Sequence, residues 1–379
     1  MSPCEKKNAS LLKGKIFVRY GADGREGALE IFGAGVGDEV GPGMSVGLKP
    51  NLVLARASSL GATTSPLVVS GVIEFLKDHG VTDITIMEGS WVGDETKRAW
   101  RACGYDEIAR RYGVKLLDLK EDATRKVTVG EFTFEVCESP FNLDYLINIP
   151  VLKGHCQTLI TCALKNLKGC LPDREKRRFH QKGLHHPIAC LNVALKPDLI
   201  LVDALCGDIS SEEGGNPVVM NRLILGRDPV KVDSYGASLL GIKKEMVGHI
   251  VLSEMLGVGS TLLSARDIVE IGHDDTKANI KNLPGTALRL TDYIEEREAC
   301  SACYASLIHA LFRMNKDLLS SLRGDNRIKI GQGWRECLGK GIGVGNCASG
   351  FEFCARGCPP KAESIACVLE ISASDASGL

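Results

Sequence analysis

The stretch MSVGLKPNLVLARASSLGATTSPLVVSGVIEFLKDHGVTDITIMEG, residues 44–89, decides the fold class. It begins with an apolar run typical of a buried strand, passes through a loop of small polar residues, and enters a helix at Ser65-Pro66. Apolar residues then recur at helical spacing up to Gly80, after which ITIMEG indicates a second strand. A strand, a helix and a strand in this order form one βαβ unit with parallel strands.

The same alternation extends on both sides of this unit. It predicts an α/β fold, with a mostly parallel sheet covered by helices on both faces, in a first domain over residues 1–285. The further strands are expected at KIFVRY (15–20), KLLDL (115–119), EFTFEV (131–136), YLINIPVLK (145–153) and LILVDAL (199–205), and the further helices near 95–112, 187–195, 229–240 and 244–256.

The composition limits the classes of partner that the protein is expected to bind. The chain has 379 residues, of which 44% are apolar and 25% charged, and its formal net charge is -1. This balance gives no general attraction to nucleic acid or to an anionic membrane. The N-terminal residues contain no apolar run long enough for a signal peptide, and no run of about 18 apolar residues occurs anywhere. We therefore expect a cytoplasmic protein that binds neither nucleic acid nor membrane.

Cysteines are concentrated at the C-terminal end. Residues 286–379 are expected to form a smaller α/β unit that is rich in cysteine. Four thiols stand out in it, two in a C-x-x-C pair before a predicted helix and two on separate glycine-rich loops. Such thiols fit an iron–sulfur cluster, and we favour one 4Fe-4S cluster over a zinc ion or a set of buried core cysteines. The four are Cys300, Cys303, Cys347 and Cys358.

The segment GVGNCASGFEFCARGCPPKAESI, residues 343–365, resembles the proximal-cluster region of the small subunits of complex I and of nickel-iron hydrogenases. In that region a G-x-C-A segment precedes a G-C-P-P element that opens a helix. The resemblance implies Cys300, Cys303, Cys347 and Cys358 as cluster ligands, with Cys354 as the alternative to Cys347.

A basic segment is hidden by the neutral overall charge. Between Lys153 and His186 there are eight lysines or arginines against two acids. Polar residues at the carboxyl ends of parallel strands are placed to bind a ligand, and lysine with asparagine suits a phosphate or a carboxylate. A solvated basic loop is the alternative reading. The candidate anion-binding residues are Lys49, Asn51, Lys153, Lys165, Asn166, Lys168 and Arg174.

Histidines accompany this basic segment. His155, His180 and His185 are candidates for proton transfer, because imidazole titrates near neutral pH. His180 and His185 could also bind a metal, in which case Asp203 and Asp208 are candidate carboxylate partners. Polar loop histidines without a chemical role are the alternative.

The segments KPNLV, ATTSP, MEGS, NIPVLKGH, ALKNLKGCLPDREKRRFHQKGLH, PDLILVDAL and GRDPVKVDSYGA occur in this order. Together they resemble the domain-of-unknown-function 362 family, over residues of about 45–260. The resemblance implies an α/β domain that is often joined to iron–sulfur modules and has no generally assigned reaction. Neither a dinucleotide-binding G-x-G-x-x-G after a strand nor a P-loop is present.

These observations favour an iron–sulfur oxidoreductase or electron-transfer protein that acts on a small anionic ligand and has a redox partner. A cluster-dependent dehydratase or isomerase is one alternative, but it needs an open iron and so only three cysteine ligands. A partner or sensor protein with a structural cluster is the other.

Overall fold

The structure is a computed structural model that describes residues 12, 14–209, 212–273, 290, 292–299, 301–312, 314, 316–322 and 324–376. The chain divides into two compact units. The first comprises Met1–Arg177 and His185–Leu283, and the second comprises Arg178–Leu184 and Pro284–Leu379.

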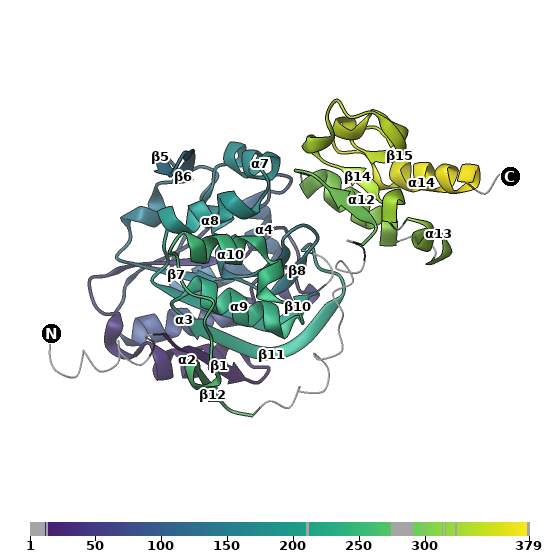
Figure 1. Cartoon of the computed structure of the whole chain (residues 1–379). Helices are drawn as coiled ribbons and strands as arrows, with labels where there is room; N and C mark the ends of the chain where they lie inside the picture. The colour runs from purple at the N-terminus through teal and green to yellow at the C-terminus, as the bar shows by residue number, and fades with distance from the viewer. Residues whose placement is uncertain are drawn as a thin grey trace. The chain divides into compact units, whose positions relative to one another are not determined.

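An eight-stranded sheet forms the centre of the first unit (Figure 1). Its strand order is β12-β1-β11-β10-β7-β2-β3-β4, and every neighbouring pair is parallel except the two pairs that β11 makes. The expected mostly parallel sheet is therefore confirmed. The strands are β1 (Ile16–Tyr20), β2 (Ser45–Pro50), β3 (Asp83–Glu88), β4 (Lys115–Asp118), β7 (Tyr145–Ile149), β10 (Leu199–Asp208), β11 (Pro217–Gly226) and β12 (Ile268–Ile271).

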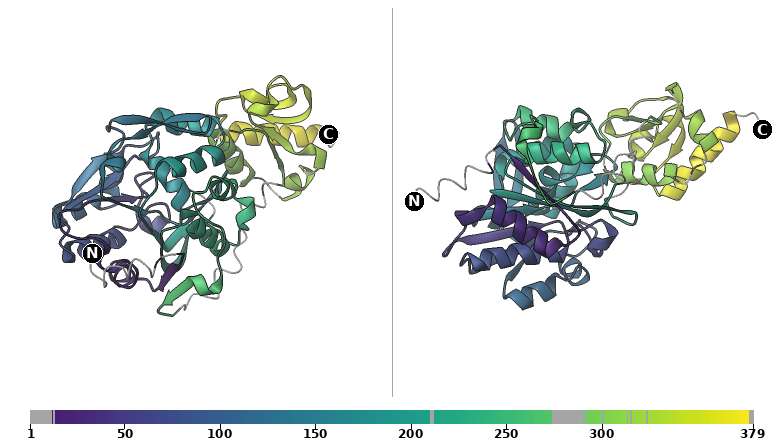
Figure 2. Two further views of the ribbon diagram at one scale, coloured as in Figure 1. Left: turned by 60° about the vertical axis from the view of Figure 1, so that its left-hand side comes forward. Right: turned by 90° about the horizontal axis from the view of Figure 1, so that it is seen from below.

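Helices cover both faces of this sheet (Figure 2). On one face α2 to α5 share a core with the inward side chains of β2, β3 and β7, and on the other α6 packs against β7 and α9 against β11. The helices are α2 (Gly24–Gly35), α3 (Pro66–Asp78), α4 (Thr96–Ala102), α5 (Tyr105–Tyr112), α6 (Ala163–Asn166), α7 (Asp173–Gln181), α8 (His185–Ala194), α9 (Pro229–Leu239) and α10 (Gly248–Met255).

Helix α3 begins where the sequence predicts. The Ser65 hydroxyl accepts a hydrogen bond from the backbone N–H of Leu67, and Pro66 occupies the first turn, where its missing N–H costs no hydrogen bond. The helix expected near 95–112 is instead two helices, α4 and α5. They are separated at Gly104, whose φ of +79° is left-handed and ends the first helix.

Two hairpins extend the first unit. One pairs β5 (Thr124–Val129) with β6 (Phe132–Cys137), and the other pairs β8 (Lys153–His155) with β9 (Leu159–Thr161). The second hairpin matters most for function, because it follows β7 at the carboxyl edge of the sheet and carries two of the predicted site residues.

The second unit contains a parallel four-stranded sheet, in the order β13-β14-β15-β16. Helix α14 packs against α12, β15 and β16. The elements are β13 (Ile294–Glu296), α12 (Ser301–Phe312), α13 (Lys316–Ser321), β14 (Ile328–Ile330), β15 (Gly339–Val344), β16 (Phe351–Ala355) and α14 (Ala362–Ala376). The apolar residues that recur at helical spacing over 302–321 belong to α12 and α13.

Within the part of the chain that the structure describes, no helix combines the length and the apolar character needed to cross a membrane.

Candidate functional site

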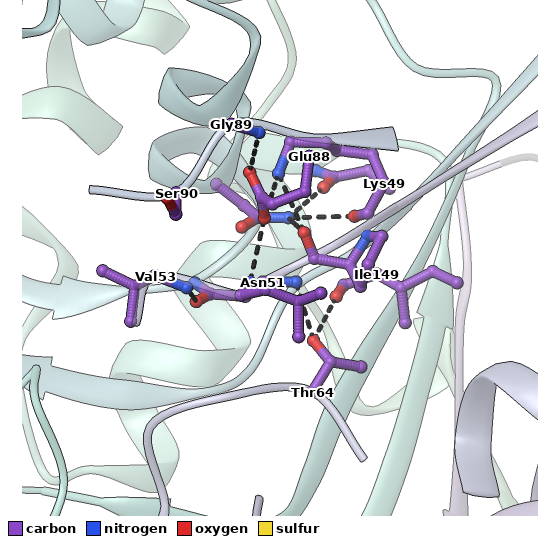
Figure 3. Close-up of polar contacts among 12 residues, drawn as sticks. Lys49, Asn51, Val53, Thr64, Glu88, Gly89, Ser90 and Ile149 are labelled. Atoms are coloured by element: carbon purple, nitrogen blue, oxygen red, sulfur yellow. Dashed lines mark hydrogen bonds and ion pairs between the residues drawn. The ribbon is translucent and has the colours of Figure 1, made fainter. Parts of the chain in front are cut away.

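A buried ion pair lies where β2 and β3 end. Lys49 Nζ is 2.8 Å from Glu88 Oε2, and both side chains are almost fully excluded from water (Figure 3). The Glu88 carboxylate also accepts hydrogen bonds from the backbone N–H groups of Leu52 and Gly89. Charges this deeply buried are tolerated only when they are paired and hydrogen-bonded. The Lys49 charge is therefore compensated within the protein.

Two other predicted residues join the strands beside this pair. Asn166 Nδ2, from α6, donates to the Lys49 carbonyl and to Asn148 Oδ1, which ties α6 to β2 and β7. The backbone N–H of Asn51 donates to Thr64 Oγ1, and that hydroxyl donates to the Ile149 carbonyl (Figure 3). Lys49, Asn51 and Asn166 thus take part in a hydrogen-bonded scaffold at the carboxyl edge of the sheet.

The structure brings Lys153, His155 and Lys165 together around one carboxylate, that of Glu212. His155 Nε2 is 2.6 Å and Lys165 Nζ 3.2 Å from the same oxygen, Glu212 Oε2. Lys153 Nζ donates to the backbone carbonyls of Glu212 (2.8 Å) and Ala62 (2.5 Å). We call Lys153, His155, Lys165 and Glu212 the basic site. It is assembled from β8, α6 and the turn between β10 and β11.

The tautomer of His155 is fixed by its surroundings. The backbone N–H groups of Gln157 and Thr158 both donate to His155 Nδ1, each at 3.1 Å. Nδ1 therefore carries the lone pair, and the proton of the neutral ring is on Nε2, which lies 2.6 Å from Glu212 Oε2. Burial lowers the pKa of His155 to about 4, although Glu212 opposes the shift. His155 is consequently a neutral hydrogen-bond donor at neutral pH.

Burial also perturbs the lysines of this region. It lowers the pKa of Lys153 to about 7, with the positive charge of Lys165 adding to the effect and Glu212 opposing it. Loss of solvation likewise lowers the pKa of Lys168, and the charge of Lys165 contributes. The pKa of Glu212 lies well below its ordinary range, because the neighbouring His155 and lysines outweigh the cost of burial. Glu212 is therefore ionised, and Lys165 and Lys153 stabilise its negative charge.

The basic site does not fit a metal ion. His155, Cys156 and Glu212 do offer ligand atoms within 4.8 Å of one another. However, a histidine binds a metal through a ring nitrogen lone pair, and in His155 that lone pair already accepts two N–H groups. Burial raises the pKa of the Cys156 thiol, and Lys165 shares the glutamate oxygen. This arrangement suits an anion rather than a cation.

The other predicted residues lie elsewhere. Arg174 is exposed and pairs with Glu135 of the β5–β6 hairpin. His180 is near the end of α7, in the segment that belongs to the second unit. His185 accepts the backbone N–H of His249 at 3.0 Å, in the contact between α8 and α10, and none of its described contacts reaches the basic site. The structure thus gathers one of the three candidate histidines with the lysines.

Two cysteines of the second unit, Cys303 and Cys354, lie beside the turn at Gly345. Cys303 Sγ, from α12, lies so close to Gly345 that a Cβ on this glycine would be 3.4 Å away, and Cys354 Sγ is 3.8 Å from the Gly345 carbonyl. Gly345 has a left-handed φ of +89°, which a larger residue rarely adopts. Cys347 and Cys358 are close in sequence to this turn, and Cys300 lies outside the described residues.

Hydrogen bonds join the two loops that carry Cys347 and Cys358. The Asn346 N–H donates to the Gly357 carbonyl at 3.0 Å, and the Gly357 N–H donates to Asn346 Oδ1 at 2.9 Å. Each loop is therefore held by the residue that directly precedes its cysteine. Thiols on neighbouring loops with close glycine backbone are ligands of the kind that a metal centre uses. Among the described residues, however, the ligand atoms of no three cysteines of the second unit lie within 4.8 Å of one another.

A family model described as "Domain of unknown function (DUF362)" matches residues 46–238, slightly more than half of the chain. The chain belongs to the DUF362 family. The match begins at β2 and ends in α9, so it contains the basic site and its scaffold. The family expected from the sequence is thus confirmed, over a shorter stretch than residues 45–260. The cysteines of the second unit lie outside the DUF362 match.

Two known proteins resemble this DUF362 chain. "Thylakoid-associated protein sll1697" of Synechocystis sp. is 24% identical over 238 residues, which cover 60% of this chain and 72% of that protein. The structure of the lactate racemase apoprotein from Thermoanaerobacterium thermosaccharolyticum is 13% identical, with a TM-score of 0.40. That similarity covers 59% of this chain and 56% of the racemase chain.

Sequence reasoning missed the acidic members of this DUF362 site. Glu212 lies in the polar turn SSEEGGNP, which carries no signal of chemistry. The carboxylates that the sequence suggested have other partners: Asp203 accepts the N–H of Ser65, and Asp208 that of Asn216. Glu88 could have been found, because it ends a strand next to the one that ends with Lys49.

Proposed function

We propose that this DUF362 protein is an iron–sulfur oxidoreductase that binds a small anionic ligand at the basic site. The observation that carries the anion part is the convergence of His155 Nε2–H and Lys165 on one carboxylate oxygen, with Lys153 beside them. Three donors held in a water-poor place favour a ligand with negative charge, because electrostatic attraction is stronger there than in bulk water.

The number of cysteines in the second unit, and the hydrogen bonds that join the loops of Cys347 and Cys358, support the metal part. Cys303, Cys347 and Cys358, with Cys354 nearby, would hold the metal centre together with Cys300. When bound, a 4Fe-4S cluster exchanges single electrons. The residues of the basic site would bind the anion and exclude water from it, and the lysines would balance its negative charge. His155 would remain a neutral hydrogen-bond donor.

Metal analysis tests the cluster. Protein purified without oxygen is expected to contain about four iron and four sulfide ions per chain, and Cys358→Ser is expected to lose most of both. Cys367→Ser is the matched control, because Cys367 is an exposed cysteine of α14 in the same unit. Stoichiometric zinc, or iron content unchanged in Cys358→Ser, would contradict the cluster assignment.

Calorimetric titration tests the anion site. Acetate and phosphate are the probes, and Lys165→Gln is expected to weaken the binding of any anion that the wild-type protein binds. Lys126→Gln is the control, because Lys126 is an exposed lysine on β5 and its replacement changes the net charge equally. Equal weakening in both variants would indicate only a general effect of charge.

A further inference from the structure

The two groups that contact the Glu212 carboxylate, His155 and Lys165, and Lys153 beside them do not depend on this carboxylate for their position. His155 is oriented by two backbone N–H groups, Lys165 Nζ also donates to Thr161 Oγ1 at 3.2 Å, and Lys153 Nζ also donates to the Ala62 carbonyl. The donors therefore form a preorganised site, and Glu212 occupies it from a different part of the chain.

The three donors are deeply buried, whereas Glu212 is not. Lys153, His155 and Lys165 are 1%, 1% and 8% exposed, but the Glu212 side chain is 28% exposed. Solvent thus reaches Glu212 before it reaches the donors. A carboxylate from solution could take the place of the Glu212 carboxylate without opening the core of the first unit.

The backbone carbonyls of Glu212, Glu213 and Gly214 are held by hydrogen bonds. The Glu212 carbonyl accepts a hydrogen bond from Lys153 Nζ. The carbonyls of Glu213 and Gly214 each accept a hydrogen bond from Arg56 Nη1, at 3.0 Å. Exchange therefore requires rotation of the Glu212 side chain alone. Such rotation is fast compared with rearrangement of a loop.

Charge favours a carboxylate as the ligand that replaces Glu212. Lys165 acts as a like charge on both Lys153 and Lys168, and one oxygen of the Glu212 carboxylate lies close to both His155 and Lys165. The arrangement presents donors to one oxygen of a planar group, as a carboxylate requires. A phosphate has three or four terminal oxygens, and these need additional donors.

We propose that the basic site is the binding site for the carboxylate of a small organic acid, and that Glu212 fills it when no ligand is bound. This inference rests on the anion site of the proposed function and names its ligand class. Glu212 is then an internal competitor, which sets the concentration of acid that is needed for binding.

The test is calorimetric titration of Glu212→Ala with acetate, at constant ionic strength. If Glu212 occupies the site nine-tenths of the time or more, its removal tightens acetate binding by about tenfold or more, because the competent fraction of protein rises accordingly. Glu213→Ala is the matched control, since it removes the exposed neighbouring carboxylate and is expected to leave acetate binding unchanged. The double variant Glu212→Ala, Lys165→Gln is expected to lose the gain.

A second variant covers the case in which Glu212→Ala does not fold. Glu212→Gln keeps the size of the side chain and removes only its charge, so acetate should again bind more tightly than in the wild-type protein. Acetate binding that is no tighter in the folded variant than in the wild-type protein would overturn the inference.

Phosphate separates this inference from the proposed function. A gain for phosphate that exceeds the gain for acetate would overturn the carboxylate class and leave the anion site standing. If neither acetate nor phosphate binds the wild-type protein or the Glu212 variants, the anion site of the proposed function itself fails, and this inference fails with it.

Discussion

At the scale of single residues, Lys153 decides how binding depends on pH. Burial lowers its pKa to about 7, so its positive charge is lost as the pH rises through neutrality. In Glu212→Ala, where no internal carboxylate competes for the site, acetate binding is therefore expected to weaken by about tenfold between pH 6 and pH 9, since one nearby charge contributes on the order of 1–2 kcal/mol. Calorimetric titration measures this change, and acetate remains ionised throughout the range.

The lowered pKa of Lys153 also makes the free energy of unfolding depend on pH. The unfolded lysine has a pKa of 10.5, so between pH 7 and 10.5 the unfolded chain binds more protons than the folded one. The Lys153 contribution to the free energy of unfolding therefore rises over that interval. Lys153→Gln should remove both trends. A pH profile of acetate binding in the Glu212→Ala background that is the same with and without this substitution would exclude Lys153 as the titrating group.

At the residue scale, the sequence could predict which side chains lie together where they follow a strand directly. Lys153 and His155 lie just beyond β7, and Lys165 belongs to the helix that packs on that strand, so their convergence follows from the topology. Glu212 could not be predicted, because a turn far along the chain brings it back to His155. Arg174 belongs to the same basic segment, yet on its helix it pairs with Glu135 of the β5–β6 hairpin.

At the scale of elements, the close approach of β8 to the turn after β10 keeps the basic site together. A Cβ on Gly154 would lie 2.5 Å from the Ile209 carbonyl carbon, nearer than real side chains come to backbone. Gly154→Ala should therefore separate β8 from this turn and lower the free energy of unfolding by about 1–3 kcal/mol. The separation should also weaken the His155–Glu212 contact, so acetate binding is expected to change with it.

Gly33→Ala is the matched control, because Gly33 lies within α2 and a Cβ there meets no atom within 4 Å. Alanine favours a helix over glycine, so this variant should be as stable as the wild-type protein or more stable by up to about 1 kcal/mol. Denaturant unfolding measures both variants. Equal stability of Gly154→Ala and Gly33→Ala would show that the turn moves to accommodate the added Cβ without lowering the free energy of unfolding.

Element-scale prediction was reliable for the parallel centre of the sheet and weaker at its margin. β2, α3 and β3 carry apolar spacing and a capping serine, which are local signals. β11 was not predicted, since its place between β1 and β10 depends on antiparallel pairing rather than on a βαβ unit. The break between α4 and α5 depends on the left-handed backbone of Gly104, which composition alone does not reveal.

At the scale of the whole molecule, each candidate site draws its described residues from one unit. Lys153, His155, Lys165 and Glu212 all belong to the first unit, and Cys303, Cys347, Cys354 and Cys358 to the second. The DUF362 match covers the first of these sites and not the second. Anion binding and metal content should therefore respond to different substitutions.

This separation gives a reciprocal prediction. Lys165→Gln should weaken acetate binding in the Glu212→Ala background and leave iron and sulfide content unchanged. Cys358→Ser in the same background should lose iron and sulfide and keep the affinity for acetate within about twofold, because substitutions that share no partners act additively. Iron analysis and calorimetric titration of the same protein batches measure both effects. Loss of acetate affinity in Cys358→Ser, with the first unit still folded, would instead mean that the metal centre and the anion site are energetically coupled.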